Sequence, residues 1–286
     1  MSKKPVQPQS AFTWIPFFEE LADKLSQWRE RQPELIEFLE SLREQGFAVT
    51  TLMETKAGGG RGLMTEIDPF TVIGIMNRGI RQEDRFAIAR AFREKFGLSA
   101  ASPEDFDGVP LLNNMSSRFV RQEHEREDYA VSNLWDVFQR AIKPEALEDD
   151  QFLASLDKAF STRGVNVNLT MALFWIRPDE FVNLDSIMRP LLKIKLPSGG
   201  LTADFYKTAI SAARSMGGSI HELSYREWVK ASDKTPKPSA SPEEEYIRVS
   251  AYWKDHDVPD RTARFVEEGI WINGYGGPVP GGSQGG

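Results

Sequence analysis

The sequence predicts a mainly α-helical protein: a multi-helical domain over residues 11–231 that contains a helix-hairpin-helix-like element, followed by a linker and an incomplete α/β segment. Apolar residues recur at three- and four-residue spacing through most of the chain, which is the period of a helix with one buried face. Glycine or proline stands where several of these stretches stop. Residues 232–245 (SDKTPKPSASPEEE) have the composition of a linker, so they separate the helical part from the C-terminal end.

The composition is that of a globular protein with ample apolar content for a core. Of the 286 residues, 40% are hydrophobic and 27% are charged. No stretch approaches the roughly 18 uncharged apolar residues of a membrane span, and residues 1–10 lack the apolar segment of a signal peptide. The absence of cysteine excludes disulfides, and together with only three separated histidines it predicts no metal and no cofactor. We therefore expect a cytoplasmic protein with no membrane partner, whose first ten residues are disordered.

The net charge of −7 argues against indiscriminate binding to polyanions, for which a basic domain is expected. A local basic face remains compatible with an acidic protein. Several arginines, interspersed with acidic residues, follow Asp68: Arg78, Arg81, Arg85, Arg118, Arg121 and Arg126. The pattern fits either a mixed, solvated surface or such a local face.

The first folded elements are predicted to be two consecutive helices. Helical periodicity runs over residues 12–28, and Pro33 then stands in the first turn of a second helix that stops at Gly46. A third helix is expected over residues 82–96, closing at Gly97. The apolar positions of these helices are those of a core.

The glycine-rich residues 58–62 (GGGRG) are expected to form a flexible loop. They lack the GK[ST] ending and the following helix of a Walker A loop, so they predict no nucleotide site. The apolar run 70–76 follows them. Further along, Ser132 is expected to cap a helix over residues 133–142, whose apolar stripe faces the core.

The turn at Arg163–Asn166 carries the strongest functional signal in the sequence. It joins an amphipathic segment over 151–161 to an apolar helix that Pro178 stops. Gly164 and Asn166 are residue types that tolerate a positive φ, as a helix-hairpin-helix turn requires. Backbone N–H groups free in such a turn can hold a nucleic-acid phosphate. The alternative is an ordinary pair of helices in which Gly164 is only a helix C-cap.

The last part of the chain is predicted to hold further helices and then short α/β elements. Thr202 is expected to cap a helix running to about residue 216. After the linker, residues 246–275 suggest a strand, a short helix and an aromatic-rich strand. About 30 residues cannot bury a stable core alone, so this segment resembles the start of a larger domain. The glycine-rich tail, residues 276–286, is expected to be disordered.

Four strings resemble the N-terminal region of McrB-type restriction proteins: FTWIPFFEELADKL, DPFTVIGIMNRGI, FDGVPLLNNMSSRF and LTMALFWIRPDEFVNLDS. They fall in the same order over residues 12–192. The later DRTARFVEEGIWINGY resembles the opening of an EVE-like (PUA-like) module, within residues 246–275. The resemblance implies a prokaryotic defence protein that reads DNA beside an AAA+ motor and a nuclease subunit. The chain contains no Walker A loop or recognisable nuclease motif, so no catalysis is expected in it.

A second resemblance is to DNA glycosylases of the helix-hairpin-helix type. The turn at Arg163–Asn166, the helix to Ile176 and the downstream Asp185 match their layout. The resemblance implies that Asp185 is a catalytic carboxylate acting at an extruded nucleotide. The hairpin offers no lysine for an imine, since Arg163 and Asn168 occupy that region, so lyase activity is not expected. The structural alternative is that Asp185 caps the next helix.

The leading hypothesis is a DNA-recognition module in which the turn binds the DNA backbone. The residues expected to contact DNA are Arg163, Gly164, Val165, Asn166, Asn113, Asn114, Arg78, Arg81, Arg118 and Arg121. The turn would present N–H groups, the arginines would add charge, and the two asparagines would read bases. One alternative is a monofunctional glycosylase-like enzyme using Asp185. Another is a protein-interaction scaffold for restriction-complex assembly, which the acidic charge favours, with self-association into a homo-oligomer as a further expectation.

Overall fold

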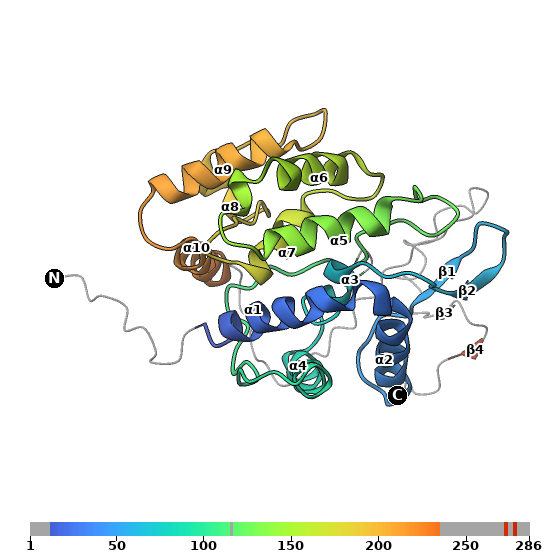
Figure 1. Ribbon diagram of the computed structural model, residues 1–286. Coiled ribbons are helices and arrows are strands. Elements are labelled where there is room, and N and C mark those ends of the chain that lie inside the picture. The colour runs from blue at the N-terminus through green and yellow to red at the C-terminus, as the bar shows by residue number, and fades with distance from the viewer. Residues whose placement is uncertain (1–11, 115–116, 235–271, 274–276, 279–286) are drawn as a thin grey trace. The chain divides into compact units, whose positions relative to one another are not determined.

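The computed structural model describes residues 12–114, 117–234, 272–273 and 277–278 (Figure 1). The chain divides into two compact units, Met1–Pro236 and Lys237–Gly286. Within the described residues, no helix is both long and apolar enough to cross a membrane.

The first unit is mainly α-helical, which confirms the predicted fold class. Its helices are α1 (Trp14–Leu25), η1 (Ser26–Arg31), α2 (Gln32–Glu44), α3 (Pro69–Gly74), α4 (Gln82–Phe96), α5 (Ala130–Ala141), η3 (Ala146–Glu148), α6 (Asp150–Ser161), α7 (Asn168–Ile176), α8 (Met188–Leu192), α9 (Ala203–Ser215) and α10 (Ile220–Lys234). An antiparallel hairpin accompanies them, formed by β1 (Met53–Thr55) and β2 (Arg61–Leu63).

The two predicted N-terminal helices are present as α1 and α2. The short 3-10 helix η1 joins them, and Pro33 lies in the first turn of α2 as expected. The predicted third helix is α4, which ends at a left-handed Gly97. The apolar run 70–76 begins with helix α3, where Asp68 accepts a hydrogen bond from the N–H of Thr71.

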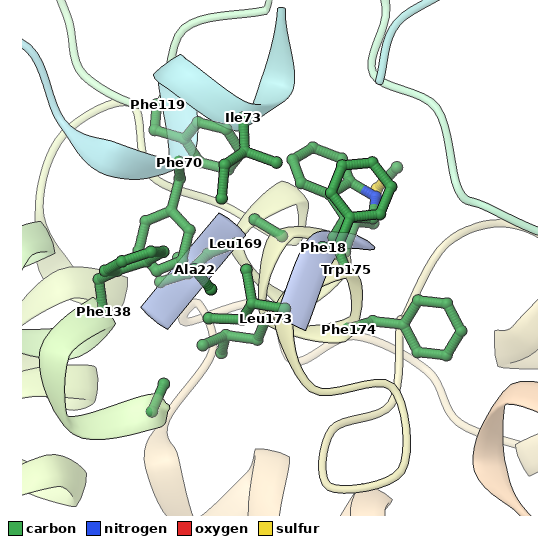
Figure 2. Close-up of a cluster of buried hydrophobic side chains, with 14 of the residues drawn as sticks. Phe18, Ala22, Phe70, Ile73, Phe119, Phe138, Leu169, Leu173, Phe174 and Trp175 are labelled. Atoms are coloured by element: carbon green, nitrogen blue, oxygen red, sulfur yellow. The ribbon is translucent and has the colours of Figure 1, made fainter. Parts of the chain in front are cut away.

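Helix α7 forms the centre of the core. Every residue from Leu169 to Ile176 is buried, because α7 packs against α1 on one side and α3 on another. An all-apolar helix is expected in such a position. Figure 2 shows side chains from four helices and one loop meeting there: Phe18, Ala22, Phe70, Ile73, Phe119, Phe138, Leu169, Leu173, Phe174 and Trp175.

The helices before and after the functional turn pack against different partners. Helix α6 lies between α5 and α9, whereas α7 contacts α1 and α3 (Figure 1). The turn over residues 162–167 therefore passes from an outer layer of the domain to its centre. The buried residues of α6 and α7 anchor the helices on both sides and so fix its ends.

One local expectation holds only in part, and another was wrong. Residues 58–60 lie in the loop that connects β1 and β2, whereas Arg61 and Gly62 belong to β2, in a hairpin that pairs Met53 with Leu63 and Thr55 with Arg61. Ser132 does not cap a helix: α5 already begins at Ala130, and the Ser132 hydroxyl donates back to the carbonyl of Tyr129. A serine inside the first turn commonly bonds back in this way.

The second unit is described only at β3 (Ile272–Asn273) and β4 (Gly277–Pro278), which pair antiparallel. Strand β3 falls inside the aromatic-rich strand predicted near its position, and β4 lies in the glycine-rich tail. The remainder of the predicted linker, of the EVE-like segment and of the tail lies outside the described residues, as do residues 1–10.

Candidate functional site

A cavity of about 580 Å³ lies between the α6–α7 turn, the segment before α5 and strand β1. Six residues predicted to contact DNA line it: Asn114, Arg118, Arg121, Gly164, Val165 and Asn166. The fold thus brings the turn together with a segment more than 40 positions earlier in the sequence. We refer to this space as the turn cavity.

The turn itself has one left-handed residue. Gly164 has a φ of +96°, as predicted, but Asn166 does not adopt a positive φ. The Asn166 side chain instead accepts a hydrogen bond from the N–H of Asn168 (2.8 Å), at the start of α7. The expectation that both residues supply the special conformation was therefore wrong for Asn166, whose side chain closes an Asx-turn just before α7.

The backbone N–H groups of the turn are only partly available. Val165 donates its N–H to the carbonyl of Thr162 (3.2 Å), so the prediction that it offers this group to a phosphate was wrong. Arg163 directs its N–H toward a carboxylate oxygen of Glu127 (3.4 Å). Among the described residues, the N–H groups of Gly164 and Asn166 have no acceptor. Two main-chain donors therefore remain for a bound anion.

The two arginines in the cavity wall differ in their freedom. Arg118 donates through Nη2 to the carbonyls of Thr51 (2.6 Å) and Met53 (2.9 Å), and burial lowers the pKa of its guanidinium. It therefore fixes the cavity wall to the β1 hairpin. Arg121 is exposed and forms no hydrogen bond or ion pair with a described residue. Its side chain is the better candidate to meet an anion.

A buried ion pair holds the hairpin against the segment before α5. Arg126 contacts Glu54 at 2.8 Å, with side-chain exposures of 5% and 0%. Lys56 joins both Glu54 (3.1 Å) and Glu123 (2.7 Å). The charged residues that line the turn cavity are Arg118, Arg121 and Glu125, so the lining carries a net positive charge.

The adjacent residues Asn113 and Asn114 differ in their position relative to the turn cavity. Asn114 lines the turn cavity and donates through Nδ2 to the carbonyl of Gly79 (2.6 Å), which fixes its position. Asn113 is exposed but does not line that cavity. Arg163 is exposed beside the turn and also lies outside the lining.

Two predicted arginine contacts are not part of this site. Arg78 is buried, and its guanidinium donates to the carbonyls of Ile75 and Ala48, so its prediction as a DNA contact was wrong. A buried arginine that satisfies backbone carbonyls serves the fold. Arg81 is exposed but pairs with Asp84 (2.9 Å) at the start of α4 and does not line the cavity.

Asp185 has the geometry of a helix cap. Its Oδ1 accepts hydrogen bonds from the N–H groups of Ile187 (2.9 Å) and Met188 (2.8 Å), where α8 begins. Burial raises the pKa of the carboxyl, and these hydrogen bonds oppose that shift. Asp185 lines a different cavity, of about 230 Å³, which Trp228 of α10 also borders.

The structure contains a Ser–His–Asp arrangement that the sequence analysis did not predict. His221 lies 2.7 Å from Asp179 through Nδ1 and 3.3 Å from the Ser219 hydroxyl through Nε2. Ser219 and Glu222 also exchange hydrogen bonds as a capping box at the start of α10. The cap explains Ser219 without catalysis. No group of three or more potential metal ligands occurs in the part of the chain that the structure describes.

Sequence reasoning missed the contribution of the β1 hairpin to the turn cavity. Thr50 and Met53 line it from this side, and Gln122 lines it from the segment before α5. A hairpin signal was available, because a glycine-rich stretch between short non-helical runs is typical of a tight β-turn. What the sequence could not show was that this hairpin faces the α6–α7 turn.

Comparison with known proteins gives a family without an assigned role. No curated protein and no solved structure matches the chain. A family model described as a domain of unknown function (DUF8425) matches residues 14–229, which include every helix from α1 to α9 and most of α10. Because this match covers more than half of the sequence, the chain belongs to the DUF8425 family.

Proposed function

We propose that the helical domain of this chain is a DNA-recognition module that holds a backbone phosphate in the turn cavity. The observation that carries the proposal is that Arg121 lines the same cavity as Gly164 and Asn166, whose N–H groups have no acceptor among the described residues. Unpaired main-chain donors and a guanidinium are groups that proteins use to bind phosphate oxygens. Arg163, exposed beside the turn, adds positive charge.

The net negative charge of the chain limits its affinity for DNA. With a net charge of −7, the protein gains affinity only from the local cluster and not from its whole surface. A site that neutralises one to three phosphates gives a plot of log K against log salt with a slope of about −1 to −3. Binding is therefore expected to be weak at physiological salt and measurable at low salt.

The proposed setting is an McrB-like, modification-dependent restriction system in a prokaryotic cytoplasm. The resemblance of four ordered sequence blocks supports it, and one of those blocks lines the turn cavity through Asn114, Ser117 and Arg118. In this setting the domain binds DNA, and a separate AAA+ motor and a nuclease subunit carry out the catalysis. Asn114 is the proposed base reader, because it lines the cavity from a fixed position.

The test measures binding of the full chain to short fluorescent duplexes, with and without modified cytosine or adenine, across a salt series. Arg121→Glu is expected to weaken binding at low salt by about tenfold or more, because it replaces the cation with a repelling charge. Arg81→Glu is the matched control, since Arg81 is exposed but lies outside the cavity. A preference for one duplex would identify the modification that is read.

Two results would overturn the proposal. One is the absence of binding at 20–50 mM salt, conditions about as favourable as any for phosphate contacts. The other is binding that Arg121→Glu and Arg81→Glu reduce equally, which would make the effect one of total charge. Circular dichroism of both variants verifies that the fold is intact.

A further inference from the structure

A second cavity, of about 640 Å³, opens between α2 and the end of β2. Its apolar floor includes Ile36, Leu63 and Met64. Leu63 keeps 41% of its surface exposed, which places it among the few large hydrophobic side chains left open within the described residues. We refer to this feature as the α2–β2 groove. It is separate from the turn cavity, with which it shares no lining residue.

One border of the groove is a free sheet edge. The N–H of Met64 donates to the carbonyl of Leu52, and the N–H of Lys56 donates to the carbonyl of Gly60. Hydrogen-bonded and non-hydrogen-bonded pairs alternate in an antiparallel ladder, so the pairs Met53–Leu63 and Thr55–Arg61 are not hydrogen-bonded to each other. In those two pairs the main-chain groups point away from the partner strand. Among the described residues, no third strand joins this sheet. Leu63 therefore offers both an apolar side chain and an unpaired N–H and C=O.

The opposite wall is acidic. Glu37 and Glu44 lie two helical turns apart on α2, both line the groove, and both are exposed. Neither forms an ion pair in the part of the chain that the structure describes, whereas Glu40 between them is bound by Arg43 (2.6 Å). Two uncompensated carboxylates beside an apolar floor attract a cationic, amphipathic ligand and repel nucleic acid.

We propose that the α2–β2 groove binds an extended segment of a partner protein in which apolar residues alternate with lysine or arginine. The segment adds to the free edge of β2 through main-chain hydrogen bonds. Its apolar side chains cover the exposed Leu63, and its cations meet Glu37 and Glu44. The surface is an assembly site distinct from the proposed DNA site, so each can fail without the other.

The experiment titrates the full chain with a fluorescent peptide of sequence RVKLKVR, blocked at both ends. Saturable binding with a Kd on the order of 100 µM or tighter is expected. The acidic peptide EVELEVE is expected not to bind, because it meets the glutamates with like charge. The peptide RVKPKVR is expected to bind much more weakly, since its central proline lacks the N–H for the sheet edge.

Protein variants locate the binding site. Glu37→Lys is expected to weaken binding of RVKLKVR about fivefold, and Leu63→Asp is expected to weaken it further. Glu94→Lys is the matched control, because Glu94 is an exposed glutamate on α4, away from the groove. DNA binding by the Glu37→Lys variant should stay at least as strong as in the parent chain.

The proposal is overturned if RVKLKVR does not bind at millimolar concentration, or if RVKPKVR binds as tightly. It is also overturned if Glu37→Lys and Glu94→Lys have equal effects. Sedimentation of the chain alone tests a different occupant: self-association that Leu63→Asp abolishes would show that a second copy, not a basic segment, covers the groove.

Discussion

The side chain of Arg121 packs directly against the backbone of Gly164. A Cβ atom at Gly164 would lie 3.0 Å from Cγ and 3.3 Å from Nε of Arg121. Because real side chains do not tolerate such a contact without movement, the absence of a side chain at Gly164 allows Arg121 to lie across the turn. This contact links the main-chain donors of the turn to the guanidinium beside them.

Gly164→Ala is therefore expected to have two separable effects. The φ of +96° costs an alanine about 1 kcal/mol of stability, and the new methyl group, 3.0 Å from Cγ of Arg121, forces that side chain to shift by a few tenths of an ångström. Chemical denaturation measures the first effect, and the salt-dependent DNA titration measures the second. DNA affinity should fall even at temperatures where the variant is fully folded.

Gly200→Ala is the matched control for that experiment. Gly200 has a φ of +94°, but nothing lies within 4 Å of the position of its Cβ. It should lose a similar amount of stability and bind DNA like the parent chain. Equal DNA affinities in the two variants would contradict a role for the contact between Arg121 and Gly164.

The sequence predicted correctly those helices and helix ends that depend on residues close together in the chain. Thr202 accepts a hydrogen bond from the N–H of Phe205 at the start of α9, as a threonine in that position predicts. Gly97 ends α4 in the left-handed conformation. The four-residue periodicity of α1 and α4 is sufficient to place them, because burial of one face needs no knowledge of the partner helix.

The errors arose where a distant residue decides the outcome. Nothing local shows that Arg78 turns inward to the carbonyl of Ala48, 30 positions earlier. Asn166 could adopt a positive φ or bond to the backbone that follows it, and the hydrogen bond that its side chain accepts from the N–H of Asn168 prevails. The turn cavity depends on how the 117–125 segment approaches the α6–α7 turn, which is a tertiary contact without a signature in sequence periodicity.

Arg126→Met is expected to destabilise the domain strongly. It removes one of the two cations paired with the fully buried Glu54, and breaking a buried ion pair costs about 3 kcal/mol, of which the remaining Lys56 at 3.1 Å offsets a part. Arg81→Met removes an exposed pair with Asp84 and should cost less than about 1 kcal/mol. Urea denaturation at neutral pH compares the two. Similar losses of stability in the two variants would contradict the prediction and would mean that solvent reaches the Glu54 carboxylate.

The interaction of Glu20 with the segment after α4 predicts a pH dependence of stability. Its carboxylate accepts hydrogen bonds from the N–H groups of Ser99 (2.9 Å) and Ala100 (2.6 Å), which lower its pKa from the usual 4.5. The folded state thus favours the charged form. The resulting stabilisation is present above the unfolded-state pKa and is lost as the pH falls through the folded-state value.

Glu20→Gln tests this linkage. The variant should be less stable than the parent chain at pH 7, and the difference should shrink toward pH 3, as followed by urea denaturation at each pH. Glu30→Gln is the control, because Glu30 is exposed and has no hydrogen bond to a described residue. A difference that stays constant from pH 7 to pH 3 would show that the Glu20 hydrogen bonds do not depend on its charge.

Asp185→Ala distinguishes a helix cap from a catalytic carboxylate. The loss of two hydrogen bonds at the start of α8 should cost about 1 kcal/mol in stability, while DNA affinity stays unchanged, because Asp185 does not line the turn cavity. Asp185→Asn keeps an acceptor oxygen and should recover much of that stability. Incubation of the parent chain and Asp185→Asn with duplexes containing modified bases supplies the decisive comparison. Release of free base by the parent chain that is lost in Asp185→Asn would mean that the carboxylate performs chemistry as well as capping, since both variants of the side chain can accept the same hydrogen bonds.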